Sequence, residues 1–338
     1  MRTPSYTAES EFAAWVNALP KTETHLHLEG STPHELLAEA FPGRFTTAPA
    51  FWSPDFRYGS FAQFEALYVG EIMPFYSSAQ RYHDAARHVL ATCVAQGCRY
   101  VETSIHLPGI AFAGLDGPEV LAAIRAATPP GLTLRIFGGL CHNDYAPHHA
   151  LIEASLGWTD LDGLDLHGPE IFEMEPWTAD VWARARAAGK FTKAHAGEFM
   201  PASYVSWVLD HLGVNRIEHG VRSIEDPVLV RRLATEGVTL DVCPISNLKL
   251  AVAGIPTMAA HPIRRLFDAG VKVTINTDDT YFFGNRLEEE YFALHQDLGF
   301  TRAELIQVAR NGIDIALLPP AAKAPIYAEL EAIAAALA

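Results

Sequence analysis

Hydrophobic residues recur along the chain in two alternating patterns. Eight short segments carry apolar residues in a run or at every second position, which favours β-strands, at residues 24–30, 99–105, 133–140, 161–166, 191–196, 215–218, 238–242 and 271–276. Other segments repeat apolar residues every three or four positions, which favours helices, at 9–18, 78–96, 117–127, 147–156, 178–188, 202–212, 226–236, 261–269, 286–298, 302–311 and 321–337. Strands that alternate with helices indicate a parallel sheet, and eight such units predict an α/β fold, a (β/α)8 TIM barrel.

Three additions to the barrel are expected. Extra helical material lies at the N-terminus, after the first strand, where Ser31-Thr32-Pro33 is a good helix start, and at the C-terminus. The segment 40–75 is irregular and rich in aromatic residues, which suggests a lid or a pocket wall, although the same residues could simply cement helices to the barrel. No linker, repeat or low-complexity tract divides the chain, so we expect one domain over residues 1–338.

Composition and charge narrow the function classes. Hydrophobic residues make up 49% of the chain and charged residues 19%, as in a globular enzyme with a large core. The formal net charge of -15 argues against nucleic acid as a partner and gives no support to an anionic membrane. The four cysteines form no Cys-x-x-Cys pair, and neither a signal-peptide core nor a membrane-spanning run is present, so we expect a cytoplasmic protein.

Ionisable residues gather where the predicted strands end. In a TIM barrel these ends meet at one face, where the chemistry takes place. The residues found there, in strand order, are His25, His27 and Glu29; His106; Cys141 and His142; Asp165 and His167; His195 and Glu198; Glu218 and His219; Cys243, Ser246 and Asn247; Asp278 and Asp279. Histidines scattered through a core would have no reason to follow consecutive strands in this way.

A metal site is the first chemistry that this cluster predicts. His25 and His27 are two positions apart, so in an extended strand both imidazoles point to one side. His195 and Asp278 complete a set of three imidazoles and one carboxylate, which is typical of a catalytic zinc ion. Iron or manganese would also accept this set of ligands.

Acid–base groups flank the predicted metal ligands. Glu198 can protonate an acceptor, His219 can orient an attacking hydroxide, and Asp279 is free to contact a substrate. Each has a plainer interpretation: the turn after His195 could be a helix cap, His219 a core histidine and Asp279 an N-cap. For His106, His142 and His167, a structural role and a place in the pocket wall are about equally supported.

Five motifs in order resemble the adenosine/adenine deaminase family of the amidohydrolase superfamily. They are residues 20–30 (PKTETHLHLEG), 195–198 (HAGE), 216–220 (RIEHG), 243–247 (CPISN) and 276–279 (NTDD). The resemblance implies one zinc ion held by His25, His27, His195 and Asp278, with Glu198 protonating purine N1 and His219 orienting the hydroxide. It further implies contacts from Asp279 to N7 and from the Gly168 backbone to N3, and we expect His27 and Glu29 to contact the substrate as well.

The exact substrate is open at this point. Glu29 stands where family members that act on adenosine usually carry Asp, while Asp165-Leu166-His167-Gly168 looks more like the adenosine branch than the adenine branch. The resemblance therefore implies hydrolytic deamination of adenine, adenosine or a modified 6-aminopurine nucleoside such as aminodeoxyfutalosine. Two rivals remain: a binuclear amidohydrolase on a cyclic amide or ester, for which Lys193 is a remote candidate for the bridging group, and a purine-binding protein without turnover. An oligomer is possible but cannot be read from the sequence.

Overall fold

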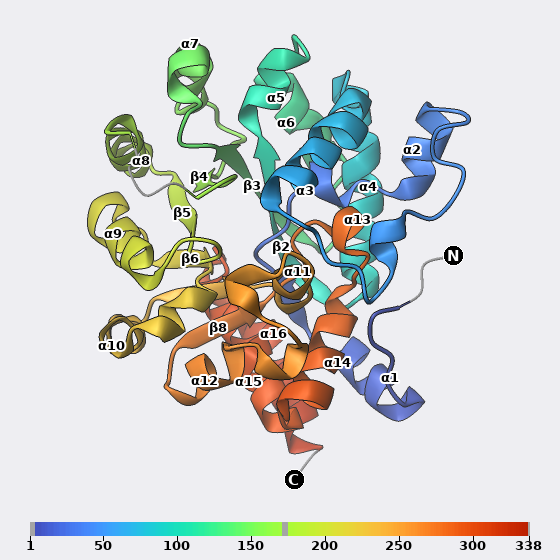
Figure 1. Ribbon diagram of the computed structural model, residues 1–338, viewed down its shortest axis with the longest axis vertical. Helices are drawn as coiled ribbons and strands as arrows, with labels where there is room; N and C mark the ends of the chain where they lie inside the picture. The colour runs from blue at the N-terminus through green and yellow to red at the C-terminus, as the bar shows by residue number, and fades with distance from the viewer. Residues whose placement is uncertain (1–3, 171–174, 337–338) are drawn as a thin grey trace.

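Eight parallel strands form the centre of the molecule (Figure 1). The computed structural model describes residues 4–170 and 175–336. The strands follow one another around the sheet in chain order: β1 (Lys21–Glu23), β2 (Cys98–His106), β3 (Thr133–Leu140), β4 (Gly163–Leu166), β5 (Phe191–Ala196), β6 (Arg216–His219), β7 (Thr239–Val242) and β8 (Lys272–Ile275). Helices surround them, which confirms the predicted (β/α)8 TIM barrel.

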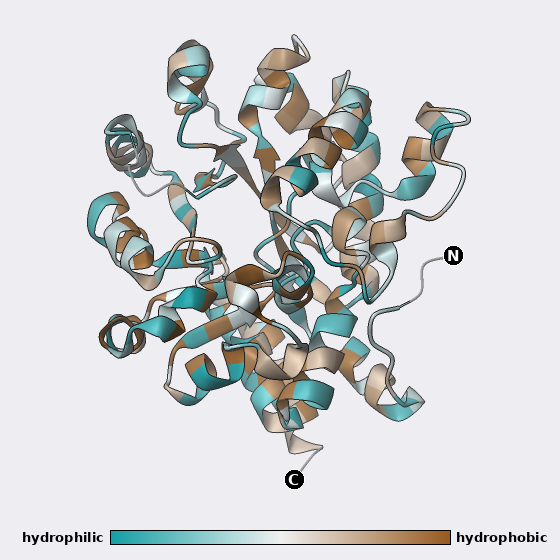
Figure 2. Cartoon of the chain, in the orientation of Figure 1, coloured by the Kyte–Doolittle hydropathy of each residue, from teal (hydrophilic) through white to brown (hydrophobic). Residues whose placement is uncertain are grey.

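After each strand, one main helix packs outside the barrel as expected. These are α4 (Ala79–Ala95), α6 (Gly117–Ala126), α7 (Tyr145–Ser155), α8 (Trp177–Ala187), α9 (Ala202–Leu212), α10 (Pro227–Glu236), α12 (Ile263–Asp268) and α15 (Arg302–Ile315). Figure 2 shows hydrophobic residues on the strands and mixed hydrophobic and hydrophilic positions on these outer helices. Their apolar faces cover the sheet, and their polar faces meet solvent.

The expected additions are also present. The chain begins with α1 (Ser10–Ala18), continues after β1 with α2 (His34–Ala40) and α3 (Phe61–Leu67), and ends with α14 (Leu287–Leu298) before α15 and α16 (Pro320–Ala335) after it. The predicted end of the last helix at Leu337 lies outside the described residues. Three short helices near the strand ends were missed: α5 (Leu107–Phe112), α11 (Pro244–Lys249) and α13 (Thr280–Phe283). With six residues or fewer, they show no helical period in the sequence.

The prediction for the first strand is wrong in its position. The strand is Lys21–Glu23, and the two histidines follow it rather than lie within it. After β1, single parallel bridges join Leu26 to Asp278 and His27 to Ser104. Leu28 already has helical backbone angles, with φ of -61° and ψ of -47°. The His27 N–H donates to the Asp278 carbonyl at 3.2 Å, and the Asp278 N–H donates to the His25 carbonyl at 3.0 Å. These contacts close the barrel between its first and last strands.

Aromatic residues of segment 40–75 form a wall above the strand ends. Phe64 on α3 packs against Phe282 and Phe283 of α13, with ring centroids 5.0 Å and 5.7 Å apart. Phe61, Phe64 and Tyr68 also line the large cavity described below. The prediction of a pocket wall is confirmed, and movement of this wall as a lid stays a prediction. Within the described ranges 4–170 and 175–336, no helix has the length and apolar character needed to span a bilayer.

Candidate active site

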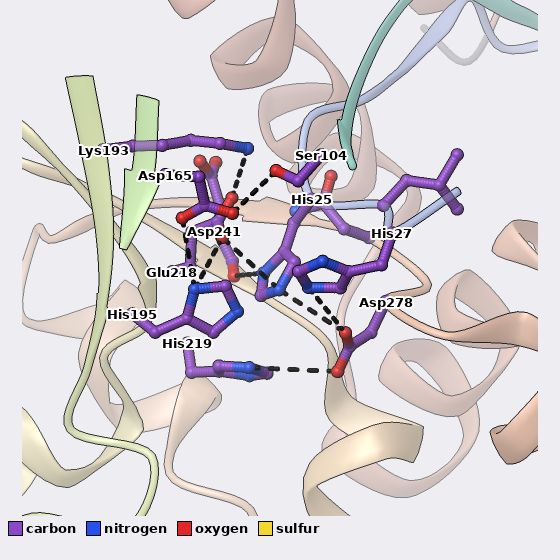
Figure 3. Close-up of polar contacts among 12 residues, drawn as sticks. His25, His27, Ser104, Asp165, Lys193, His195, Glu218, His219, Asp241 and Asp278 are labelled. Atoms are coloured by element: carbon purple, nitrogen blue, oxygen red, sulfur yellow. Dashed lines mark hydrogen bonds and ion pairs between the residues drawn. The ribbon is translucent and has the colours of Figure 1, made fainter. Parts of the chain in front are cut away.

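Four side chains from three parts of the barrel meet at its carboxyl end (Figure 3). The Nε2 atoms of His25 and His27 lie 3.6 Å and 3.3 Å from Oδ1 of Asp278. The ring of His195 lies 4.8 Å from that of His25 and 5.3 Å from that of His27, centroid to centroid. All four residues are buried. The structure therefore brings together the residues predicted as metal ligands.

Hydrogen bonds to the Nδ1 atoms orient two of these imidazoles. Nδ1 of His25 bonds to the Asp241 carbonyl at 2.9 Å, and the buried Nε2 of His25 has no hydrogen-bond partner within residues 4–170 and 175–336. Nδ1 of His195 lies 3.0 Å from the Leu166 carbonyl and 3.3 Å from Asp165. Burial lowers the pKa of His25 and of His27 well below the ordinary value, so both rings are neutral and keep lone pairs for a metal ion.

Glu218 is a fifth member of this cluster that sequence reasoning left without a role. Its Oε2 lies 3.0 Å from Nδ1 of His195 and 3.7 Å from Nε2 of His25. Ligand atoms of His25, His27, His195 and Glu218 all lie within 4.8 Å of one another. On its other side Glu218 forms a close ion pair with Nζ of Lys193. This fully buried ion pair lies at the base of the predicted metal site.

The ion pair belongs to a larger charged network inside the barrel. Lys193 also lies 3.8 Å from Glu102 and donates to the Thr24 carbonyl at 3.0 Å. Arg216 lies 2.7 Å from Glu102 and 2.6 Å from Asp241. The carboxylates raise the pKa of Lys193 although burial opposes it, so the ammonium group stays charged. Asp241 in turn is the residue whose carbonyl orients His25.

The predicted acid and base lie side by side next to the imidazoles. Nε2 of His219 is 3.6 Å from Oε1 of Glu198 and 3.9 Å from Oδ2 of Asp278. Burial and the nearby Asp278 raise the pKa of Glu198 well above the usual range, which favours its protonated form. Burial lowers the pKa of His219, which favours the neutral ring. A protonated carboxyl can donate a proton, and a neutral imidazole can hold an attacking oxygen by a hydrogen bond.

Two side chains that sequence reasoning gave no role fix the ring of His219. Nδ1 of His219 lies 3.0 Å from the side-chain amide nitrogen of Asn247, and the amide oxygen of Asn247 lies 3.2 Å from Nε2 of His261. Because the amide nitrogen can only donate, Nδ1 of His219 accepts and its proton is on Nε2, which points toward Glu198 and Asp278.

Glu170 was also missed, and it holds the turn that carries Glu198. One oxygen of its carboxylate accepts the backbone N–H of Glu198 at 3.0 Å. The other accepts the N–H groups of Phe199 at 2.9 Å and Met200 at 2.5 Å. A carboxylate that accepts three backbone bonds fixes the path of the chain, so Glu170 determines where Glu198 can reach.

The paired aspartates point to different partners. Oδ2 of Asp278 accepts from the Ser246 hydroxyl at 2.6 Å, while Asp279 is buried and lines the cavity. Burial and the charge of Asp278 raise the pKa of Asp279 well above its ordinary value. A Cβ on Gly30 would lie 1.5 Å from Oδ1 of Asp279, so only glycine at position 30 leaves room for this carboxyl group.

Glu29 and Gly168 occupy different depths of the site. Gly168 lines the cavity with a φ of 79°, a left-handed conformation that favours glycine. Glu29 is fully buried and accepts the backbone N–H of His106 at 3.0 Å. It is not one of the described residues that line the cavity. Burial raises its pKa to about 7. A contact between Glu29 and a substrate stays a prediction.

The acid, the base and most of the predicted ligands open into one cavity of about 580 Å³. Its inner end carries His27, His195, Glu198, His219, Asp278 and Asp279, and its outer walls carry mostly apolar residues, Phe61, Phe64, Tyr68, Val69, Met73, Phe112, Ala113 and Leu250. Among the described residues that line it, none is a lysine or an arginine. A cavity of this kind accepts a small neutral ring system whose polar edge faces the inner end.

The chain belongs to the adenosine deaminase family, whose sequence pattern matches residues 20–333. It is 35% identical over 343 residues to an adenine deaminase of Sphingopyxis alaskensis, and the alignment covers 97% of this chain and 99% of the relative. It is also 36% identical over 325 residues to an adenine deaminase of Bordetella parapertussis, and that alignment covers 90% of this chain and 98% of the relative. Among solved structures, the adenine deaminase of Arthrobacter aurescens superposes with a TM-score of 0.83 at 27% identity and covers 93% of this chain and 98% of its own.

Proposed function

We propose that this protein is a zinc-dependent adenine deaminase that converts the 6-aminopurine and water into the 6-oxopurine and ammonia. The observation that carries the proposal is the pair Glu198 and His219, whose side chains lie 3.6 Å apart beside the three-imidazole cluster at the inner end of the cavity. The relatives from Sphingopyxis alaskensis and Bordetella parapertussis, both adenine deaminases, support the choice of substrate.

The residues of the cluster fit a zinc ion. Among the residues that the structure describes, the buried Nε2 of His25 has no hydrogen-bond partner, and neutral imidazoles with one carboxylate are the donors that catalytic zinc uses. We assign His25, His27, His195 and Asp278 as its ligands; the position of Glu218 makes it a competing carboxylate. When bound, zinc would supply Lewis acidity that makes water a nucleophile at neutral pH.

The protein groups then handle protons and orientation. Glu198, held protonated by burial, would donate its proton to purine N1 as water adds to C6. His219 would hydrogen-bond the attacking oxygen. Glu198 would pass the first proton that it receives from this oxygen to the amino group, which leaves as ammonia, and the second proton from the oxygen would restore the protonated carboxyl of Glu198. Asp279, whose raised pKa favours a protonated carboxyl, can donate a hydrogen bond to N7, and the Gly168 N–H can donate to N3.

A second candidate substrate is a 6-aminopurine with a neutral substituent on N9. The cavity of about 580 Å³ lies in the range that holds drug-sized ligands, which leaves space beyond a single adenine ring. Adenosine and aminodeoxyfutalosine both belong to this class. The absence of lysine and arginine from the described lining argues against phosphorylated substrates, since phosphates are usually met by such cations.

The alternative of a binuclear amidohydrolase finds no support at Lys193. A lysine that bridges two metal ions must give up its charge, whereas Lys193 is held as an ammonium by Glu218 and Glu102. We also propose that the only partner is a small-molecule substrate and that the protein is cytoplasmic. The four free cysteines support the cytoplasmic location, because the cytoplasm keeps thiols reduced.

A substrate panel tests the proposal. The zinc-loaded protein is incubated with adenine, adenosine, deoxyadenosine, aminodeoxyfutalosine and AMP, while ammonia release and the loss of the aminopurine absorbance are followed. We expect the highest kcat/KM with adenine and none with AMP. Turnover of a nucleoside with higher kcat/KM would establish the second candidate instead. Purine binding without turnover of any member would refute deamination.

A further inference from the structure

Three side chains with metal-binding atoms lie in the cavity wall beside the proposed zinc site, and none of them belongs to that site. They are His106, the last residue of β2; Cys141, which follows β3; and His167, which follows β4. A ring nitrogen of each histidine and the sulfur of Cys141 all lie within 4.8 Å of one another. All three residues line the cavity, and neither the proposed reaction nor the fold gives them a role.

Their spacing is close to that of a metal site. Nδ1 of His106 and Nε2 of His167 are 3.0 Å apart. Around a tetrahedral zinc ion, with Zn–N near 2.0 Å and Zn–S near 2.3 Å, neighbouring ligand atoms are roughly 3.3–3.6 Å apart. The two rings therefore need to separate by only a few tenths of an ångström. Because each ligand sits at the end of a barrel strand, the scaffold that holds them is rigid.

Two glycines make room for these side chains. A Cβ on Gly139 would lie 2.2 Å from Cε1 of the His167 ring, and a Cβ on Gly168 would lie 2.5 Å from Sγ of Cys141. Any larger residue at position 139 or 168 would push one ligand away. The backbone is therefore shaped to let the imidazole and the sulfur approach each other.

The protonation states suit metal binding at the cost of one proton. Burial lowers the pKa of His106 to about 3 and that of His167 to about 4, so both rings are neutral at pH 7. The N–H shared between them can move to the far nitrogen of its own ring without a change of charge. Burial and the nearby Asp144 raise the pKa of Cys141, so the thiol must lose its proton when the S–metal bond forms.

We propose that His106, Cys141 and His167 form a second metal site, selective for zinc-class ions, whose occupation blocks the cavity. Thiolate and imidazole ligands together favour zinc over magnesium or calcium. The ion would lie next to Gly168, because Sγ of Cys141, one of its ligand atoms, lies next to this glycine. If the proposed function holds, an ion at this position excludes the purine edge that Gly168 would bind, and excess zinc inhibits the enzyme.

Cobalt titration of the metal-free full-length protein tests the site directly. The first equivalent of Co²⁺ should enter the His-rich cluster, and the second should produce the near-ultraviolet absorption of a cobalt–thiolate bond. Cys141→Ser should bind one equivalent and lack this band. Cys243→Ser is the matched control, because Cys243 is the thiol near His25, His219 and Asp278, and it should keep the band. A band that survives in Cys141→Ser, or the absence of a second equivalent in the wild type, would overturn the proposal.

Two further measurements keep the test independent of folding and of deamination. His167→Asn, checked for native circular dichroism, should weaken the second equivalent at least tenfold and leave the first unchanged; unchanged affinity for the second would contradict the assignment. Because one proton leaves per metal ion, the affinity should rise about tenfold per pH unit below the thiol pKa. Inhibition by excess Co²⁺ should share the midpoint of the cobalt–thiolate band. Inhibition by excess Co²⁺ and by excess zinc should both disappear in Cys141→Ser. A protein without deaminase activity would refute the proposed function, while the cobalt titration would still decide this site.

Discussion

Replacing Glu170 by glutamine should lower activity although Glu170 is neither a proposed metal ligand nor a proposed proton-transfer group. Its two carboxylate oxygens accept the N–H groups of Glu198, Phe199 and Met200. Glutamine keeps the shape of the side chain but has one oxygen, and its –NH₂ group can only donate. In either orientation of the amide, at least one backbone N–H then faces another donor.

The size of the effect follows from these bonds. A buried N–H group left without an acceptor costs about 1–3 kcal/mol. The turn will relieve part of that cost by moving, and a displacement of about 1 Å at a catalytic group lowers the rate about 100-fold. We therefore expect Glu170→Gln to lower kcat roughly 10- to 100-fold with little change in KM, and to lower Tm by a few degrees.

The assay compares steady-state deamination, melting temperature and metal content of the wild type, Glu170→Gln and Glu175→Gln. Glu175 is an exposed glutamate just before α8, so its variant should match the wild type in all three measurements. Metal content should stay unchanged in both variants. A Glu170→Gln protein with kcat within twofold of the wild type and an unchanged Tm would show that the turn carrying Glu198 does not depend on Glu170.

Four other outcomes test the site and the fold. Glu198→Gln should lower kcat by at least about 100-fold while the bound metal is retained, and an active variant would exclude Glu198 as the proton shuttle. Lys193→Met should destabilise the protein by about 3–5 kcal/mol in urea unfolding, because the buried Glu218 loses its ammonium partner, and Lys193→Met/Glu218→Leu should recover much of the loss. Burial lowers the pKa of His261 to about 3, so stability falls as the pH drops from about 6.5 toward 3; His261→Gln should be spared about 2 kcal/mol of this loss at pH 5, as pH-dependent unfolding would reveal. A chelator should abolish turnover and lower Tm, and added zinc should restore both; turnover unaffected by the chelator would exclude a metal-dependent reaction.

The barrel could be predicted because each strand and helix carries its own local pattern. The burial of β5 and β7, for example, depends on residues that are adjacent in the sequence. The convergence of His25, His195 and Asp278 was also predictable, because the carboxyl ends of parallel strands meet at one face. The supporting contacts were not, because Glu170 and Asn247 act on residues 28 positions away through bonds that exist only in the folded chain.

The misplaced first strand has the same cause. The sequence around His25 and His27 alternates as a strand should, but the hydrogen bonds that define a strand depend on its neighbours. Next to β8, Thr24 bonds to the side chain of Asn276, and Leu26 forms a single bridge with Asp278 instead of a ladder. A local pattern therefore predicted a strand where the folded chain forms only single bridges.

The closure of the barrel also explains a strained residue at the site. Asp278 has a φ of 67°, a left-handed conformation that costs a residue with a side chain about 1–3 kcal/mol. Its N–H donates to the His25 carbonyl and its carbonyl accepts from the His27 N–H, so the backbone is held on both sides by the two histidines. The bonds that close the barrel thus hold three proposed metal ligands in one geometry before any metal ion binds. Loss of this closure should loosen the metal site and the barrel together.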